Sequence, residues 1–227
     1  MDDYADSLEK IQVDKKRDKD EETTYRENCD LRELIGKIAW LSQNLRPDLS
    51  YGTLSLQKRV NNSTISDIRY VNKLVDKSKN RKNKIHFVKV GKPEDLVVFG
   101  LGDASYTAGQ GKNSAIKGKF ILIGTKHTNK VSSLFWKTKT IKQVCKSPKD
   151  SETINACMLC DKTRHLANQM SDLLFGKNGR RIPAVVFTDS LRTLESIAST
   201  KQVERNLMHQ HIYTFQQHLE RNGSQMN

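Results

Sequence analysis

Cysteine is scarce in this chain, which has four of them among 227 residues. Two of the four, Cys157 and Cys160, form a single C-x-x-C, but a structural zinc site normally needs a second pair of ligands at matching spacing. The pair also falls inside a helical pattern and not at a helix start, which disfavours a redox site. We therefore expect free, buried thiols.

Long apolar runs are absent as well. No stretch approaches the length of a membrane-spanning helix, and the first ten residues, MDDYADSLEK, have neither the positive charge nor the apolar run of a signal peptide. We therefore expect an intracellular protein, in the cytoplasm or the nucleus, with no membrane partner.

Acidic residues are missing from one long part of the chain. Between Ala104 and Lys149 there are ten lysines and no Asp or Glu, and the whole chain carries a net charge of +13. Such a balance suits a polyanion, because each neutralised phosphate releases bound counterions. Lysine, unlike arginine, favours contact with the backbone over the reading of bases. The alternative is a solvated lysine-rich surface.

The first third of the chain contains helical patterns. Residues 1–24 are strongly charged and nearly free of large apolar groups, so we expect a charged leader, flexible or a frayed helix, that contributes little core. Residues 25–84 carry apolar side chains at helical spacing and, at Thr64 and Asp67, a capping box. The pattern predicts a small helical subdomain.

Strand patterns dominate the remainder, residues 85–227. We expect strands at Ile85–Val90, Leu96–Leu101, Gly118–Gly124, Ser133–Lys137 and Ala184–Phe187. A long helix from about residue 150 to 175 precedes the last of them. Three or more strands, a helix and a further strand predict an α/β fold with a mixed sheet.

Three carboxylates occupy comparable places in this pattern. Asp103 follows the apolar run that ends at Leu101, Asp189 follows the run that ends at Phe187, and Glu152 lies at the start of the long helix. A cluster of these groups is costly unless cations neutralise it, so the pattern predicts a divalent metal site. The alternative is that the two strand-end Asp residues only cap turns.

Several short motifs follow one another along most of the chain. They are Leu34-Ile35-Gly36 to Trp40 with Arg46-Pro47-Asp48, Asn72 to Val75, Asp103-Ala104-Ser105-Tyr106, Phe135-Trp136-Lys137, Ser151-Glu152-Thr153 and Thr188-Asp189. In this order and spacing the chain resembles the end of a copia-type LTR-retrotransposon polyprotein. In that family the last part of the reverse transcriptase is followed by a ribonuclease H domain. The polymerase motif Tyr-x-Asp-Asp is absent, so we expect no polymerase activity.

The resemblance implies a ribonuclease H-like fold in which Asp103, Glu152 and Asp189 are three of four catalytic, metal-binding carboxylates. In that mechanism two Mg²⁺ ions, or Mn²⁺ in their place, hold the scissile phosphate of RNA in an RNA–DNA hybrid. The lysines that flank the centre in sequence would bind the nucleic-acid backbone: Lys112, Lys117, Lys119, Lys137, Lys139, Lys142 and Lys146.

The chain also departs from the family pattern. The family's fourth carboxylate lies on a last helix after a fifth strand, and the sequence ends at Asn227 before either, so we expect a truncated sheet. An open edge beside Ala184–Phe187 predicts self-association. Three functions stay open: a nuclease that cleaves RNA in RNA–DNA hybrids, a catalytically inactive retroelement remnant that only binds nucleic acid, and a basic surface for another partner such as an acidic protein.

Overall fold

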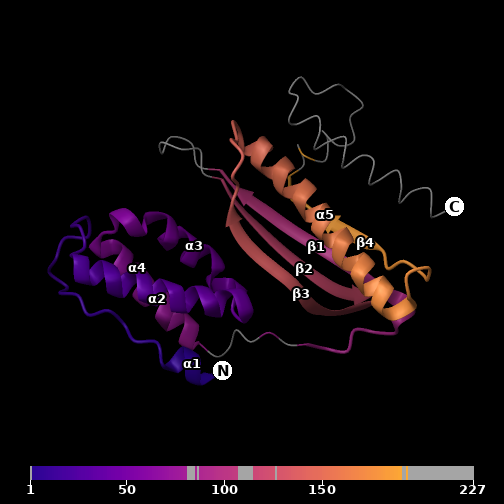
Figure 1. Ribbon diagram of the computed structural model, residues 1–227, viewed down its shortest axis with the longest axis horizontal. Coiled ribbons are helices and arrows are strands. Elements are labelled where there is room, and N and C mark those ends of the chain that lie inside the picture. Colours follow the sequence, from indigo (N-terminus) through magenta and orange to yellow (C-terminus); the bar gives the residue numbers. More distant parts are fainter. Residues whose placement is uncertain are drawn as a thin grey trace. The chain divides into compact units, whose positions relative to one another are not determined.

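The computed structural model describes residues 2–80, 85, 87–106, 115–125, 127–190 and 193. The chain divides into two compact units, Met1–Ile85 and His86–Asn227. We call the first the helical unit and the second the sheet unit (Figure 1).

The helical unit is built from amphipathic helices around one apolar core. Its elements are α1 (Asp2–Asp6), α2 (Tyr25–Asn44), η1 (Pro47–Leu49), α3 (Ser50–Arg59), η2 (Val60–Asn62) and α4 (Ile65–Lys79). The predicted capping box is present at the start of α4, where the Thr64 backbone N–H donates to Asp67 Oδ2 at 3.1 Å. The helices expected from the pattern of residues 25–84 are therefore present as far as Lys79, and residues 81–84 lie outside the described residues.

Arg46, from the Arg-Pro-Asp motif, ties the end of α4 to the rest of this unit. Its guanidinium donates to both carboxylate oxygens of Asp48, at 2.9 and 3.0 Å, and to the backbone carbonyl oxygens of Lys77 and Ser78. The last carbonyls of a helix lack partners within the helix; the guanidinium supplies a donor to that of Ser78 and a second donor to that of Lys77, which also accepts from the Asn80 N–H. In the described chain this motif stabilises the fold.

The expectation that residues 1–24 contribute little core is wrong. Leu8 is only 1% exposed and belongs to the core of the helical unit. The backbone N–H and C=O of Ile11 form reciprocal hydrogen bonds with the Asn72 side chain, at 3.0 and 2.8 Å. Arg17 makes ion pairs with Glu21 and Glu27. Some of the charges that suggest flexibility are thus paired, and Leu8 anchors the segment in the core.

The sheet unit is a mixed α/β arrangement. Its strands are β1 (Leu96–Ser105), β2 (Ile116–Thr125), β3 (Thr128–Thr140) and β4 (Ala184–Phe187), and its helices are η3 (Pro93–Asp95) and α5 (Pro148–Phe175). The strand order is β3-β2-β1-β4. Pairing is antiparallel except between β1 and β4, which are parallel. The expected mixed sheet is therefore confirmed, with β4 at one edge of the described sheet.

One expected strand is wrong. The described residues of the run Ile85–Val90 belong to no strand. The backbone of Val88 instead bonds the side chain of Ser132 on β3, through its N–H at 2.9 Å and its carbonyl at 3.0 Å. The Ser132 hydroxyl thus takes the place of the backbone hydrogen bonds of a strand pair. An alternation of apolar residues in the sequence is compatible with either kind of hydrogen bonding.

Two glycines let α5 lie close against β1 (Figure 1). A Cβ added at Gly100 would be 2.3 Å from Thr163 Oγ1, and one at Gly102 would be 2.9 Å from Leu159 Cδ2. Leu159 and Ala167 of α5 pack with Val98 and other apolar residues of the sheet. This close packing fixes which residues of α5 lie beside the end of β1.

Candidate functional site

The structure brings the three predicted carboxylates together. Asp103 lies near the end of β1, Glu152 in the first turns of α5, and Asp189 two residues after β4. Each offers a carboxylate oxygen, and these atoms all lie within 4.8 Å of one another. Because β1 and β4 are parallel, their carboxyl ends meet at one edge of the sheet. We call this group the carboxylate cluster, and it is close enough to bind a metal ion.

Glu152 is the most enclosed member of the cluster. Asp103 and Asp189 are exposed, whereas Glu152 is half-buried and accepts a hydrogen bond from the Ala104 backbone N–H at 3.2 Å. Burial, together with the negative charges of Asp103 and Asp189, raises the pKa of Glu152 to about 7, against the opposing effect of the Ala104 N–H. Three acids crowded in this way provide a strong local attraction for a cation.

Asn155 is a site residue that the sequence analysis missed. Its side-chain Nδ2 donates to the backbone carbonyl of Asp103 at 2.9 Å and to that of Gly118 at 3.3 Å. It lies one turn after Glu152, so it ties the end of β1 and the facing strand β2 to the helix that carries Glu152. A polar residue between Ile154 and Ala156, on the buried part of a helix, was the available signal.

The turn after β4 holds Asp189 between two hydroxyl-bearing neighbours. The backbone N–H of Ser190 donates to Thr188 Oγ1 at 3.2 Å, and the Ser190 hydroxyl shares a 2.8 Å hydrogen bond with the hydroxyl of Thr193. Ser190 therefore organises this turn through local hydrogen bonds.

Asp150 lies outside the carboxylate cluster. Its backbone N–H donates to the Ser147 hydroxyl oxygen at 3.1 Å, and its Oδ2 accepts from the Lys146 backbone N–H at 2.9 Å. A carboxylate in the first turn of a helix is stabilised there by the helix dipole. Asp150 is thus explained by the start of α5 alone.

The cysteine pair carries no site within the described residues. All four cysteines are free thiols, and burial raises the pKa of Cys157 and of Cys160 to about 12. A protonated thiol is a poor nucleophile and metal ligand. The thiols are free, as expected, but the expectation of burial holds only for Cys145 and Cys157, since Cys160 is half-buried and Cys29 is exposed.

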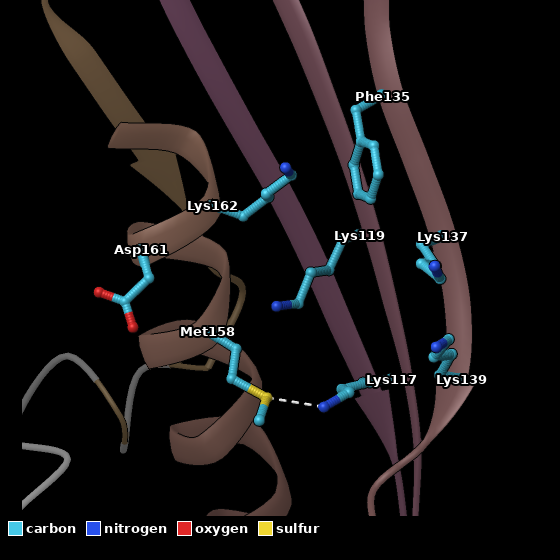
Figure 2. Close-up of a pocket in the computed structure, with 8 residues that line it drawn as sticks. All are labelled: Lys117, Lys119, Phe135, Lys137, Lys139, Met158, Asp161 and Lys162. Atoms are coloured by element: carbon cyan, nitrogen blue, oxygen red, sulfur yellow. Dashed lines mark hydrogen bonds between the residues drawn. The ribbon is translucent and has the colours of Figure 1, made fainter. Parts of the chain in front are cut away.

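Four of the seven predicted lysines gather on one side of α5. Lys117 and Lys119 on β2 and Lys137 and Lys139 on β3 line a groove with a volume of about 440 Å³. The remaining lining residues are Phe135 on β3 and Met158, Asp161 and Lys162 on α5 (Figure 2). We call this site the lysine groove. Lys142 and Lys146 are exposed and do not line it, and Lys112 lies outside the described residues.

The ammonium groups in the lysine groove perturb one another. Burial and the charge of Lys117 lower the pKa of Lys119 to about 8, against a smaller opposing effect of Asp161. Burial and then Lys139 lower the pKa of Lys117, and Lys139 lowers that of Lys137. Lys162, which the sequence analysis missed, contributes a further charge, and its Nζ lies 5.1 Å from the centre of the Phe135 ring.

Two further observations bear on function. Every helix in the described ranges is too short or too polar to cross a membrane. Comparisons with protein-family models, with curated proteins and with solved structures found no match.

Proposed function

We propose that this protein is a metal-dependent nuclease that cleaves the RNA strand of RNA–DNA hybrids. The observation that carries the proposal is the carboxylate cluster, in which oxygens of Asp103, Glu152 and Asp189 lie within 4.8 Å of one another. Acids at the ends of two parallel strands and at the start of one helix are the arrangement that the ribonuclease H resemblance implies.

The donor set suits Mg²⁺, or Mn²⁺ in its place, because hard divalent cations prefer oxygen ligands. When bound, such an ion polarises the phosphate and lowers the pKa of a coordinated water. The chain's own residues supply the rest: the Ala104 N–H orients Glu152, and Asn155 holds the end of β1 beside it. Half-burial of Glu152 strengthens its attraction for a cation by keeping it from full solvation.

The sheet topology gives the proposal further support. Three antiparallel strands, a long helix and a fourth strand parallel to the first agree with the mixed sheet that a ribonuclease H-like fold requires. Selection of RNA would come from contacts with 2′-hydroxyl groups across the minor groove of the hybrid. A retrotransposon origin of the chain remains part of this proposal.

A second candidate function is binding of nucleic acid without cleavage. It is favoured by the lysine groove, whose basic side chains are distinct from the three acids and do not need a metal. Two of the three acids are exposed, so a metal held by them alone would be weakly enclosed.

One assay separates the two functions. The chain is incubated with a labelled RNA–DNA hybrid and Mg²⁺ beside the variants Asp103→Asn, Glu152→Gln and Asp150→Asn. The proposal predicts that cleavage is lost in the first two and retained in Asp150→Asn, because Asp150 lies two residues from Glu152 but outside the cluster. Salt-sensitive binding with no cleavage by the unaltered chain favours the second candidate. Equal cleavage by all four proteins rejects the cluster as the active site.

A further inference from the structure

We propose that the lysine groove holds a short run of consecutive phosphodiester groups of one nucleic-acid strand. The inference rests on the proposed class of ligand, nucleic acid, but not on cleavage. It assigns the groove, and not the exposed lysines of the same stretch, as the main contact with the backbone.

The first argument is the regular placement of the charges. Lys117 and Lys119 are two residues apart on β2, so they project from the same face about 6.8 Å apart. Lys139 pairs with Lys117 across the sheet, and Lys137 pairs with Lys119. The result is two cross-strand pairs of ammonium groups in succession (Figure 2). A chain of regularly spaced single negative charges matches such a ladder better than one compact anion does.

The second argument is the cost of the arrangement to folding. Like charges directly opposite on neighbouring strands destabilise a sheet. Here two such pairs stand together, and burial further disfavours the charge on Lys119 and Lys117. Among the described residues that line the groove, Asp161 is the one acid beside five lysines. The mutual repulsion of the lysines costs folding free energy, and an anionic ligand would relieve it.

The lysine groove lies near the carboxylate cluster along the strands. Lys117 pairs with Ala104 in the sheet, and Gly118 pairs with Asp103, so Lys117 lies one register position from Asp103 but projects from the opposite face of the sheet. Along α5, six residues, or about 9 Å of helix, separate Glu152 from Met158 in the groove. The groove and the cluster are therefore neighbouring sites, and the inference does not require one strand to occupy both.

The lining also favours a nucleic-acid strand over an acidic peptide. Phe135 and Met158 supply apolar and polarisable surface beside the ammonium groups, and the Lys117 ammonium lies 2.6 Å from Met158 Sδ (Figure 2). Such surface suits the ribose and base faces of a nucleotide chain. The absence of arginine from the described lining fits contact with phosphates without readout of bases.

Occupation of the groove by phosphates should change protonation. The charged groups that surround Lys119 are Lys117 on its own strand, Lys137 and Lys139 on β3, and Asp161 and Lys162 on α5, with the Cys160 thiol nearby. With a pKa of about 8, Lys119 is partly neutral at that pH in the free protein. A nearby phosphate favours the charged form, so binding at pH 8 should take up protons.

The test measures binding in the absence of cleavage. A fluorescently labelled single-stranded DNA of twelve nucleotides is titrated with Asp103→Asn protein in EDTA, and the affinity is measured at several salt concentrations. Two further variants are made in that background: Lys119→Gln with Lys137→Gln in the groove, and Lys89→Gln with Lys92→Gln as a matched control. Both pairs remove two charges from the sheet unit, but Lys89 and Lys92 are exposed and outside the groove.

We expect the groove pair to weaken binding about tenfold or more and to reduce the salt slope by about 1.4, since single strands lose about 0.7 per phosphate contact. The control pair should change the affinity less than about twofold. The groove pair should also melt no lower than its parent, since it removes repulsion. Binding to the unaltered groove should release or absorb heat that varies with the ionisation enthalpy of the buffer at pH 8.

Three results would overturn the inference. Equal weakening by both pairs would indicate a diffuse lysine surface. Displacement of the oligonucleotide by tripolyphosphate at equal phosphate concentration would indicate a site for a compact anion. A lower melting temperature that accompanies the loss of binding would indicate a structural role. If instead the groove pair loses binding while the unaltered chain fails to cleave any hybrid, the inference stands and only the nuclease proposal fails.

Discussion

The carboxylate cluster and the lysine groove are both sites of crowded like charge, negative in the first and positive in the second. Both crowd like charges beside α5, and in both, burial and neighbours shift a pKa towards the neutral form: that of Glu152 rises to about 7 and that of Lys119 falls to about 8. Each site therefore weakens the fold when it is empty and charged. Binding of a partner of opposite charge at either site should therefore stabilise the folded chain.

The two sites differ in how the charge is spread. The three acids place oxygens within 4.8 Å of one another, which suits a single small cation or a close pair. The five lysines line a groove of about 440 Å³, which suits an extended anion. The comparison shows how one helix and four strands can present two distinct electrostatic sites, provided that α5 is held in a fixed position against β1.

The largest expected effect is confined to the carboxylate cluster. Asp189→Asn should reduce Mg²⁺-dependent cleavage of an RNA–DNA hybrid by about a thousandfold, which corresponds to about 4 kcal/mol of the barrier. Its binding of the hybrid in EDTA should be unchanged, because the lysine groove is intact. Steady-state cleavage and binding measured on the same preparation check both statements. Loss of binding together with cleavage would indicate that the carboxylate cluster and the lysine groove form a single site.

The next effect should reach both sites at once, through the packing of α5 on β1. Gly100→Val should cost about 2–3 kcal/mol of the free energy of unfolding, because its Cβ would lie 2.3 Å from Thr163 Oγ1 in a packed interior. Displacement of α5 would move Glu152 and Lys162 together. Denaturant unfolding followed by circular dichroism gives the free energy.

Gly36→Ala is the matched control for the Gly100 variant. Gly36 lies inside helix α2, and no heavy atom lies within 4 Å of an added Cβ. The substitution should therefore stabilise the protein by about 0.5–1 kcal/mol through helix propensity. A Gly100 variant as stable as the Gly36 variant would mean that α5 is not held by close packing.

A smaller effect should separate the cluster from the groove. Asn155→Leu removes the side-chain donor to the carbonyls of Asp103 and Gly118, and the loss of such a hydrogen bond costs about 0.5–1.5 kcal/mol. Cleavage should fall because Asp103 is less well placed, whereas the affinity of the groove for a single strand should stay within about twofold. Metal titration followed by calorimetry should show weaker Mg²⁺ binding. Equal loss at both sites would show that Asn155 supports the whole sheet unit.

The sequence was sufficient to predict those features that depend on local patterns. The acids at 103, 152 and 189 lie near the ends of regular elements, as expected, although β1 continues past Leu101 to Ser105 and so includes Asp103. The capping box of Thr64 and Asp67 could likewise be predicted from the sequence, because its two residues are separated by the characteristic three positions. Local spacing carries this information directly.

What the sequence did not reveal depends on contacts between distant segments. Asn155 acts on backbone carbonyls 52 and 37 residues away, and the pairing of Leu8 with the helical core is equally non-local. The run Ile85–Val90 alternates like a strand, but Ser132 bonds its backbone through a side chain. Lys162 belongs to the groove only because α5 lies beside β2 and β3. In each case the local sequence pattern is compatible with more than one structure, and tertiary packing determines which one forms.

The smallest expected effect is a pH dependence that belongs to the groove alone. The pKa of Lys119 in the folded chain is about 8, below its ordinary value of 10.5, so between these values the unfolded chain binds more protons than the folded chain. The free energy of unfolding should therefore rise with pH from about 8 towards 10.5, and the penalty is fully present below pH 8. After allowance for solvent screening of this half-buried group we expect about 1 kcal/mol, or 2–4 °C in melting temperature.

Melting temperatures of the unaltered chain, Lys119→Gln and the exposed control Lys130→Gln are compared between pH 7 and 9.5. Lys119→Gln should melt higher at pH 7, and its advantage should shrink as the pH rises, whereas Lys130→Gln should track the unaltered chain. A constant difference across this range would mean that Lys119 is not strained by its neighbours, and the symmetry between groove and cluster would then be lost.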